Sequence, residues 1–247
     1  MSTTTDFETA AGGYIMAIHT TGPETHNVVD LFSRQPIHTL KQQRIIRVAP
    51  EYDGISMLYS NNHTNNNKLY TLKVLCWGLK GNGDVVGLVP WLNKVYECEG
   101  LDDPVHGQWE GYYDVERECI FSDPPRHKVM ELEEACNYFQ QPESNEETPI
   151  QEIPDTIGTH AMLNAEDKNS LILTEVISWQ LLANGSIQGM LIDEDNVTET
   201  PVLAGDPCLY PVTTNPNFRF FFQHHIANQI KSEDPDALAA IALLFDS

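Results

Sequence analysis

Hydrophobic and polar positions alternate in several short runs of the chain, a pattern typical of β-strands. The clearest runs lie in residues 77–89, WGLKGNGDVVGLV, where an Asn-Gly step separates two apolar segments. Residues 179–191, WQLLANGSIQGML, repeat the same spacing of Trp, Leu, Asn-Gly and Gly. Asn-Gly between apolar runs favours a type I′ turn, because both central residues of that turn have positive φ. Each stretch therefore predicts a β-hairpin that carries a tryptophan, Trp77 or Trp179, on its first strand.

A longer repeat surrounds the two hairpins. A shift of 102 residues, without gaps, places Trp77 on Trp179 and also Asp53 on Asp155. A constant offset that holds through a loop, a strand and a turn indicates internal duplication of a β-rich unit. The alternative is two unrelated hairpins that share the same turn chemistry.

Three stretches have helical character. Apolar residues in 128–140 recur every three or four positions, which predicts a short amphipathic helix. In residues 234–245, Asp234 stands as an N-cap and Pro235 at the first helical position, which predicts a C-terminal helix. Residues 218–231 could begin as the end of a strand, but their later apolar residues favour a second C-terminal helix.

These patterns together predict an α+β fold that is mainly antiparallel, with two tandem related β-rich units. Residues 1–140 form the N-terminal unit, with a basic segment and the short middle helix. Residues 141–153, rich in Glu with two Pro, form an acidic linker. Residues 154–247 form the C-terminal repeat with its terminal helices.

The charge of the chain limits its partners. Thirty-six acidic and 14 basic residues give a formal net charge of −22. Such a field repels nucleic acid and anionic membranes, so neither is expected as a direct partner. The charge is consistent with solubility or adaptation to salt, with a basic protein partner, or with mimicry of nucleic acid. The sequence does not specify an oligomeric state.

The cysteines and the N-terminal residues indicate the compartment. The five cysteines are odd in number and contain no CxxC pair, which predicts neither a disulfide framework nor a cysteine zinc site. The first residues lack a basic stretch followed by an apolar run, and no segment is apolar enough to span a bilayer. The expected location is cytoplasmic.

The densest polar chemistry lies in residues 106–114. On a strand, His106, Glu110, Tyr112 and Asp114 would share one face, next to Trp109. That face could be an acid/base or metal constellation, or simply the wet side of an antiparallel sheet.

The paired tryptophans have two interpretations. Trp77 and Trp179 either anchor the core of each hairpin or form an exposed aromatic groove between the repeats. The chain contains no P-loop, dinucleotide, nucleophile-elbow or His-Glu-x-x-His motif, and no cofactor is expected.

Two classes of function follow from these features. The first is a non-enzymatic binding protein that engages a basic protein partner or small ligand through a cleft between the repeats or an acidic face. The second is a metal-dependent hydrolase or isomerase that uses the face of His106, Glu110 and Asp114.

Overall fold

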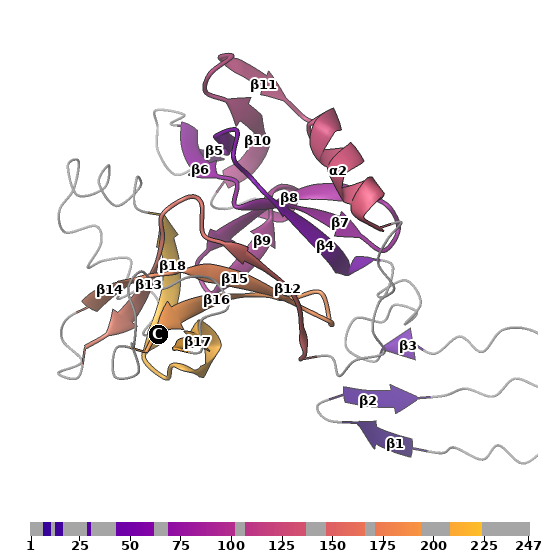
Figure 1. Cartoon of the computed structure of the whole chain (residues 1–247), viewed down its shortest axis with the longest axis vertical. Coiled ribbons are helices and arrows are strands. Elements are labelled where there is room, and N and C mark those ends of the chain that lie inside the picture. Colours follow the sequence, from indigo (N-terminus) through magenta and orange to yellow (C-terminus); the bar gives the residue numbers. More distant parts are fainter. Residues whose placement is uncertain are drawn as a thin grey trace, which may run out of the picture.

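A computed structural model describes residues 43–61, 69–101, 107–136, 147–165, 171–193 and 208–223, together with the backbone of three short strands near the N-terminus. These strands form a separate antiparallel sheet: β1 (Phe7–Ala10), β2 (Gly13–Met16) and β3 (Val29–Asp30). The other elements form four sheets, which Figure 1 shows gathered into one body.

Residues 43–136, here called the first unit, contain two of the four sheets. The strand orders are β4-β7-β8-β9 and β11-β10-β5-β6. The elements are β4 (Ile45–Pro50), β5 (Ile55–Asn61), β6 (Leu69–Lys73), β7 (Cys76–Lys80), β8 (Val85–Trp91), β9 (Lys94–Glu97), the 3-10 turn η1 (Cys98–Leu101), β10 (Gly107–Asp114), β11 (Cys119–Phe121) and helix α2 (Arg126–Cys136).

Residues 147–223, here called the second unit, contain the other two sheets. Their orders are β12-β15-β16-β17 and β14-β13-β18. The elements are β12 (Pro149–Pro154), β13 (Thr159–Asn164), β14 (Leu171–Glu175), β15 (Ser178–Leu182), β16 (Ile187–Ile192), β17 (Leu209–Pro211), the 3-10 turn η3 (Val212–Thr214) and β18 (Phe218–Gln223).

The two units pair their strands in the same way. Strands β4 to β10 correspond in order and in antiparallel partners to β12 to β18, and a 3-10 turn precedes the last strand of each set. In the described residues, the first unit continues beyond this set with β11 and α2. Strand β12 begins at Pro149, so residues 149–153 of the expected linker belong to a sheet.

The α+β fold expected from the sequence is wrong. The described residues are mostly strand, with one complete α-helix, α2, which confirms the short helix expected over residues 128–140 as far as Cys136, since residues 137–140 lie outside the described part. Residues 218–223, which the sequence left as a possible strand end while favouring a helix, form strand β18, and residues 224–247 lie outside the described part. No helix in the described part has the length and apolar character needed to cross a bilayer.

Burial on both sides explains why FRFFFQ is a strand. Phe220, Phe221 and Phe222 are all buried, but Phe221 belongs to one hydrophobic cluster and its two neighbours to another. Successive side chains point to opposite faces of a strand, so three consecutive apolar residues are suited to a strand between two cores. The helical spacing of the residues after Gln223, on which the helix was predicted, does not determine the structure of residues 218–223.

Both Asn-Gly hairpins form, but with a different turn from the one expected. In the first, Gly83 has a φ of 95° and Asn82 is not among the residues with positive φ. The N–H of Gly83 donates to the carbonyl of Lys80, and the Asn82 side chain accepts from the N–H of Asp84. This is a three-residue loop that ends in one left-handed glycine, and Gly185 (φ 88°) ends the second hairpin loop in the same way.

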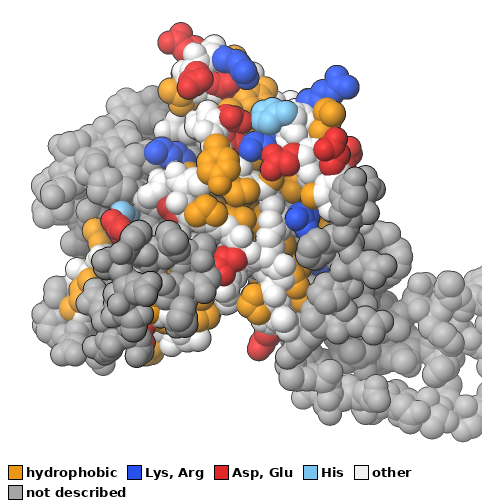
Figure 2. Space-filling view, viewed as in Figure 1, with side chains coloured by type: hydrophobic (Ala, Val, Ile, Leu, Met, Phe, Trp, Pro, Cys, Tyr) orange, Lys and Arg blue, Asp and Glu red, His pale blue; other side chains and the backbone are white. Residues whose placement is uncertain are grey.

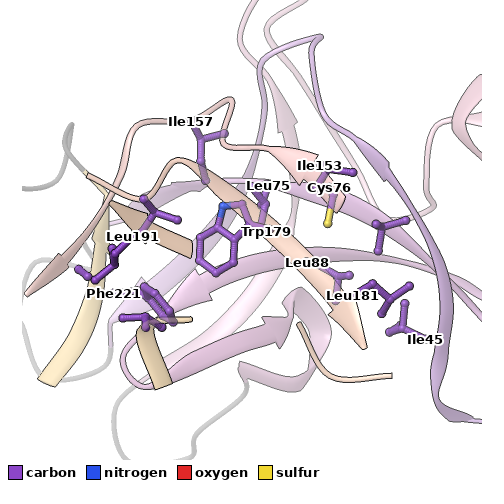
Figure 3. Packing of buried hydrophobic residues seen from close by; sticks show 14 of the residues in the cluster. Ile45, Leu75, Cys76, Leu88, Ile153, Ile157, Trp179, Leu181, Leu191 and Phe221 are labelled. Carbon is purple, nitrogen blue, oxygen red and sulfur yellow. The ribbon is translucent and has the colours of Figure 1, made fainter. Parts of the chain in front are cut away.

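The contact between the units is a continuous hydrophobic core. One cluster combines Leu75 and Leu88 of the first unit with Trp179, Leu191 and Phe221 of the second. Figure 3 shows these side chains gathered around the Trp179 ring. The strands of one unit therefore form part of the core of the other.

Candidate functional site

Both repeated tryptophans are buried, which settles their two interpretations in favour of the core. Trp77 and Trp179 have no exposed surface. The Trp77 indole N–H donates to Glu51 Oε2 at 2.5 Å, and the Trp179 indole N–H donates to Asp155 Oδ1 at 2.9 Å. In each case the second carboxylate oxygen accepts backbone N–H groups of the following corner. These side chains hold the corners and form no exposed groove.

The last glycine of each repeated motif makes room for an aromatic ring. A Cβ on Gly87 would lie 2.6 Å from the Tyr112 ring, and a Cβ on Gly189 would lie 3.1 Å from the Phe221 ring. Each ring also packs on the tryptophan of its own unit, with centroids 4.9 Å apart in both pairs. The Trp/Gly spacing read from the sequence is therefore a packing motif.

The residues of the 106–114 segment do not form one polar face. His106 lies outside the described residues. The register of β10 against β5 shifts between Trp109 and Gly111, so Glu110 stands in a bulge. A bulge adds one residue and breaks the alternation on which a shared face depends.

The other members of this segment have separate structural roles. Tyr112 is fully buried, its hydroxyl accepts the N–H of Gly87, and burial raises the pKa of its phenol. Glu110 is exposed, and hydrogen bonds from Gln108 and Ser60 lower the pKa of its carboxyl. Asp114 is buried and accepts the N–H groups of the turn that follows it.

A hollow beside α2 brings together polar residues that the sequence did not group. It lies between the β4–β5 corner, the β10–β11 hairpin and the first turn of α2, and we call it the α2 hollow. Among its lining residues are Tyr52, Asp53, Asp114, Glu116, Arg117, Cys119, Arg126 and His127. Figure 2 shows acidic, basic and histidine side chains close together in the upper part of the described surface, with hydrophobic atoms beside them.

Two of the acids in the α2 hollow already have partners. His127 Nε2 lies 2.9 Å from Asp53 Oδ2, and both side chains are more than half exposed. Arg117 Nη1 lies 3.2 Å from Asp114 Oδ2. Lys128, which is buried, donates from Nζ to the Pro50 carbonyl at 2.9 Å. The first turn of α2 is thereby fixed to the β4–β5 corner.

The outer side of α2 is acidic around an apolar centre. Leu132 is buried beneath the helix, while Met130 is 49% exposed on the outer side. A shallow depression there is lined by His127, Met130, Glu131, Glu134 and Ala135. We call this depression and the adjoining α2 hollow the α2 face. The stretch 114–136 that builds most of it contains seven acidic and three basic residues.

Two observations concern metal-binding and nucleophilic groups among the described residues. No group of three or more His, Cys, Asp or Glu side chains in the described part is placed to hold a metal ion. Burial raises the pKa of the Cys76 and Cys98 thiols, so both stay protonated at neutral pH and are poor nucleophiles.

Comparisons of the chain with protein-family models, curated proteins and solved structures gave no match. Inference about function therefore rests on this chain's own residues. The α2 face had one signal in the sequence, the acids interspersed with apolar residues in 128–140. The corner of Tyr52 and Asp53 had none, because only the fold brings it to the helix.

Proposed function

We propose that this protein is a non-enzymatic binding protein whose α2 face engages a basic segment of a partner protein. The observation that carries the proposal is the outer side of α2, where exposed Met130 lies among Glu131, Glu134 and His127. An exposed apolar side chain among acids suits a partner that offers an apolar residue flanked by Lys or Arg.

The placement of α2 supports this assignment. The strand arrangement of the second unit is complete in the described residues without an equivalent of β11 and α2. The first unit carries this additional segment on a scaffold held by buried Leu132 and Lys128. The additional segment packs on the sheets of the first unit and exposes Met130 on its outer side, so it is well placed to bind a partner.

The net charge supports a basic partner. A chain of net charge −22 attracts positively charged partners over distances of about a Debye length, roughly 8 Å at physiological salt. The shared core occupies the space where the sequence placed an inter-repeat cleft, which favours the α2 face over a cleft as the binding surface.

A labelled peptide of arginine and leucine, RRLRRLRRLR, tests the proposal. Fluorescence anisotropy would compare its binding to the unchanged chain, to Glu131→Gln/Glu134→Gln and to the control Asp84→Asn/Glu99→Gln. Both variants remove two exposed acids, but only the first removes them from α2. We expect affinity to fall at least fivefold for the α2 variant and less than twofold for the control. Equal losses would show attraction to net charge alone and would refute a site on α2.

We also propose that the two units are copies of one ancestral β-unit. The common strand order, the paired indole–carboxylate contacts and the glycine–aromatic contacts support this interpretation. In this view the second unit stabilises the first, and β11 with α2 is the part specialised for binding.

A further inference from the structure

The edges of the four sheets in residues 43–223 differ in how they are protected. Exposed strand edges offer unpaired N–H and C=O groups, and proteins shield them with Pro, Lys, short strands or covering groups. Seven of the eight edges have such a device. Side-chain amides cover two edges, Gln151 on β4 and Gln223 on β6. Lys94 protects β9, and prolines protect β12 (Pro149 and Pro154) and β17 (Pro211). Strand β11 is short, and β18 is covered by a bridge to Leu92.

The remaining edge, β14, has none of these devices in the described residues. Its sequence, LILTE, contains no Pro or Lys, and its single charge, Glu175, is the last residue. The register from Leu171 to Glu175 against β13 is uninterrupted, so no bulge bends the edge away. In the first unit, the corresponding edge strand β6 has the N–H and C=O of Lys73 bonded by the Gln223 amide.

The exposed side chains of β14 lie on both faces of the strand. Ile172 is 49% exposed and its neighbour Leu173 is 46% exposed. Adjacent residues of a strand point to opposite sides of the sheet. A body that docks on one face would cover only one of them, whereas a strand added alongside β14 would shield both.

We propose that the edge of β14 binds an extended, positively charged segment of a partner protein by strand addition. Backbone hydrogen bonds would supply much of the affinity, and apolar side chains beside Ile172 and Leu173 would add to it. The net charge of the chain favours a basic partner over a second copy of the chain. A second copy would bring another net charge of −22 and be repelled, whereas a basic strand is attracted. This site is separate from the α2 face and does not depend on it.

The test uses a nine-residue peptide in which Thr and Val alternate between terminal lysines, KTVTVTVTK, and its glutamate counterpart, ETVTVTVTE. Binding would be followed by amide hydrogen exchange and by NMR titration of the full chain. We expect the lysine peptide to slow exchange at amides of β14 at least tenfold. We expect the glutamate peptide to bind at least tenfold more weakly, and the lysine peptide to lose affinity as salt rises.

Two variants make the test specific. Leu173→Lys adds an edge charge and should weaken the lysine peptide at least tenfold. Ile120→Lys changes an even more exposed apolar residue on another edge strand, β11, and should change binding less than twofold. Equal effects of the two variants, or protection away from β14, would overturn the proposal. So would dimerisation of the chain in sedimentation that Leu173→Lys abolishes, because a second copy would then be the occupant.

Discussion

The carboxylates that accept the indole N–H groups at the two corners are individually important to the fold. Glu51 is 3% exposed, and its two oxygens accept the Trp77 indole N–H and backbone N–H groups. A glutamine there would keep the shape but place an NH₂ group against N–H donors. Hydrogen bonds to charged groups contribute about 1.5–3 kcal/mol each. We therefore expect Glu51→Gln to lower the free energy of unfolding by about 2–3 kcal/mol in urea titrations.

The neighbouring acid Asp53 supplies the matched control for Glu51. Its side chain is 52% exposed and contacts His127 at the surface. Exposed ion pairs contribute about 0–1 kcal/mol, so Asp53→Asn should change stability by less than about 1 kcal/mol. A Glu51→Gln variant as stable as Asp53→Asn would contradict the role of the indole–carboxylate contact.

Glu110 offers a pH-dependent test at the residue scale. The Gln108 amide, which lies 3.0 Å from Glu110 Oε1, and then Ser60 lower the carboxyl pKa below its ordinary 4.5. A folded-state pKa below the unfolded one stabilises the fold above the unfolded pKa, and this contribution is lost as pH falls through the folded pKa. We expect Gln108→Ala to raise the Glu110 pKa toward 4.5 in an NMR titration. An unchanged pKa would show that Gln108 does not hold the carboxylate.

Residue-scale patterns identified the tryptophans but not their partners. The ungapped shift aligned Asp53 with Asp155, whereas Glu51 makes the contact that Asp155 makes in the second unit. The corners are two residues further apart in the sequence than the tryptophans, because β5 and the connection to β6 are together two residues longer than β13 and the connection to β14. A constant offset cannot detect such a difference, and the longer Glu side chain reaches the indole from its own position.

At the scale of elements, the hairpin glycines provide a matched comparison. Gly83 and Gly185 both have a left-handed backbone, which costs a side chain about 1–2 kcal/mol. A Cβ on Gly83 would meet open space, but one on Gly185 would lie 2.8 Å from Arg44 Cβ and 3.0 Å from the backbone of Ile45. We expect Gly83→Ala to cost about 1 kcal/mol and Gly185→Ala clearly more, by thermal or urea unfolding.

Asparagine substitutions distinguish the two causes of destabilisation at these glycines, which are the left-handed backbone and the clash of a new Cβ with its neighbours. Asn tolerates the left-handed region, so Gly83→Asn should recover most of the stability lost in Gly83→Ala. Gly185→Asn should not recover it, because the clash with the first unit remains. Equal behaviour at the two turns would show that contact between the units does not constrain the second hairpin.

The sequence predicted those elements whose structure is determined by nearby residues. The Asn-Gly hairpins and helix α2 follow from turn chemistry and periodicity. For β18 the sequence favoured a helix over a strand end, because Phe220, Phe221 and Phe222 are placed by two separate cores, which only the assembled fold provides. The α2 face was missed for a similar reason, since Asp53 meets His127 across 74 positions of sequence.

At the scale of the whole molecule, two glutamines join the units by imitating a strand. The Gln151 amide accepts the N–H of Val48 at 3.0 Å and donates to its carbonyl at 2.6 Å. The Gln223 amide does the same with Lys73, at 2.8 and 2.9 Å. Each amide satisfies one donor and one acceptor of the other unit's backbone, which explains why these polar side chains are retained beside a hydrophobic interface.

The shared core and these two amides imply that the units unfold together. Because Trp179 and Phe221 share a cluster with Leu75 and Leu88, neither unit can expose its own core without exposing part of the other. We expect one cooperative urea transition with coincident circular dichroism and tryptophan fluorescence. Gln223→Ala leaves both Lys73 backbone groups without their partner and should cost about 1–3 kcal/mol without separating the transition into two. Two resolved transitions in the unchanged chain would mean that the units are independent domains, and the second unit would then not stabilise the first.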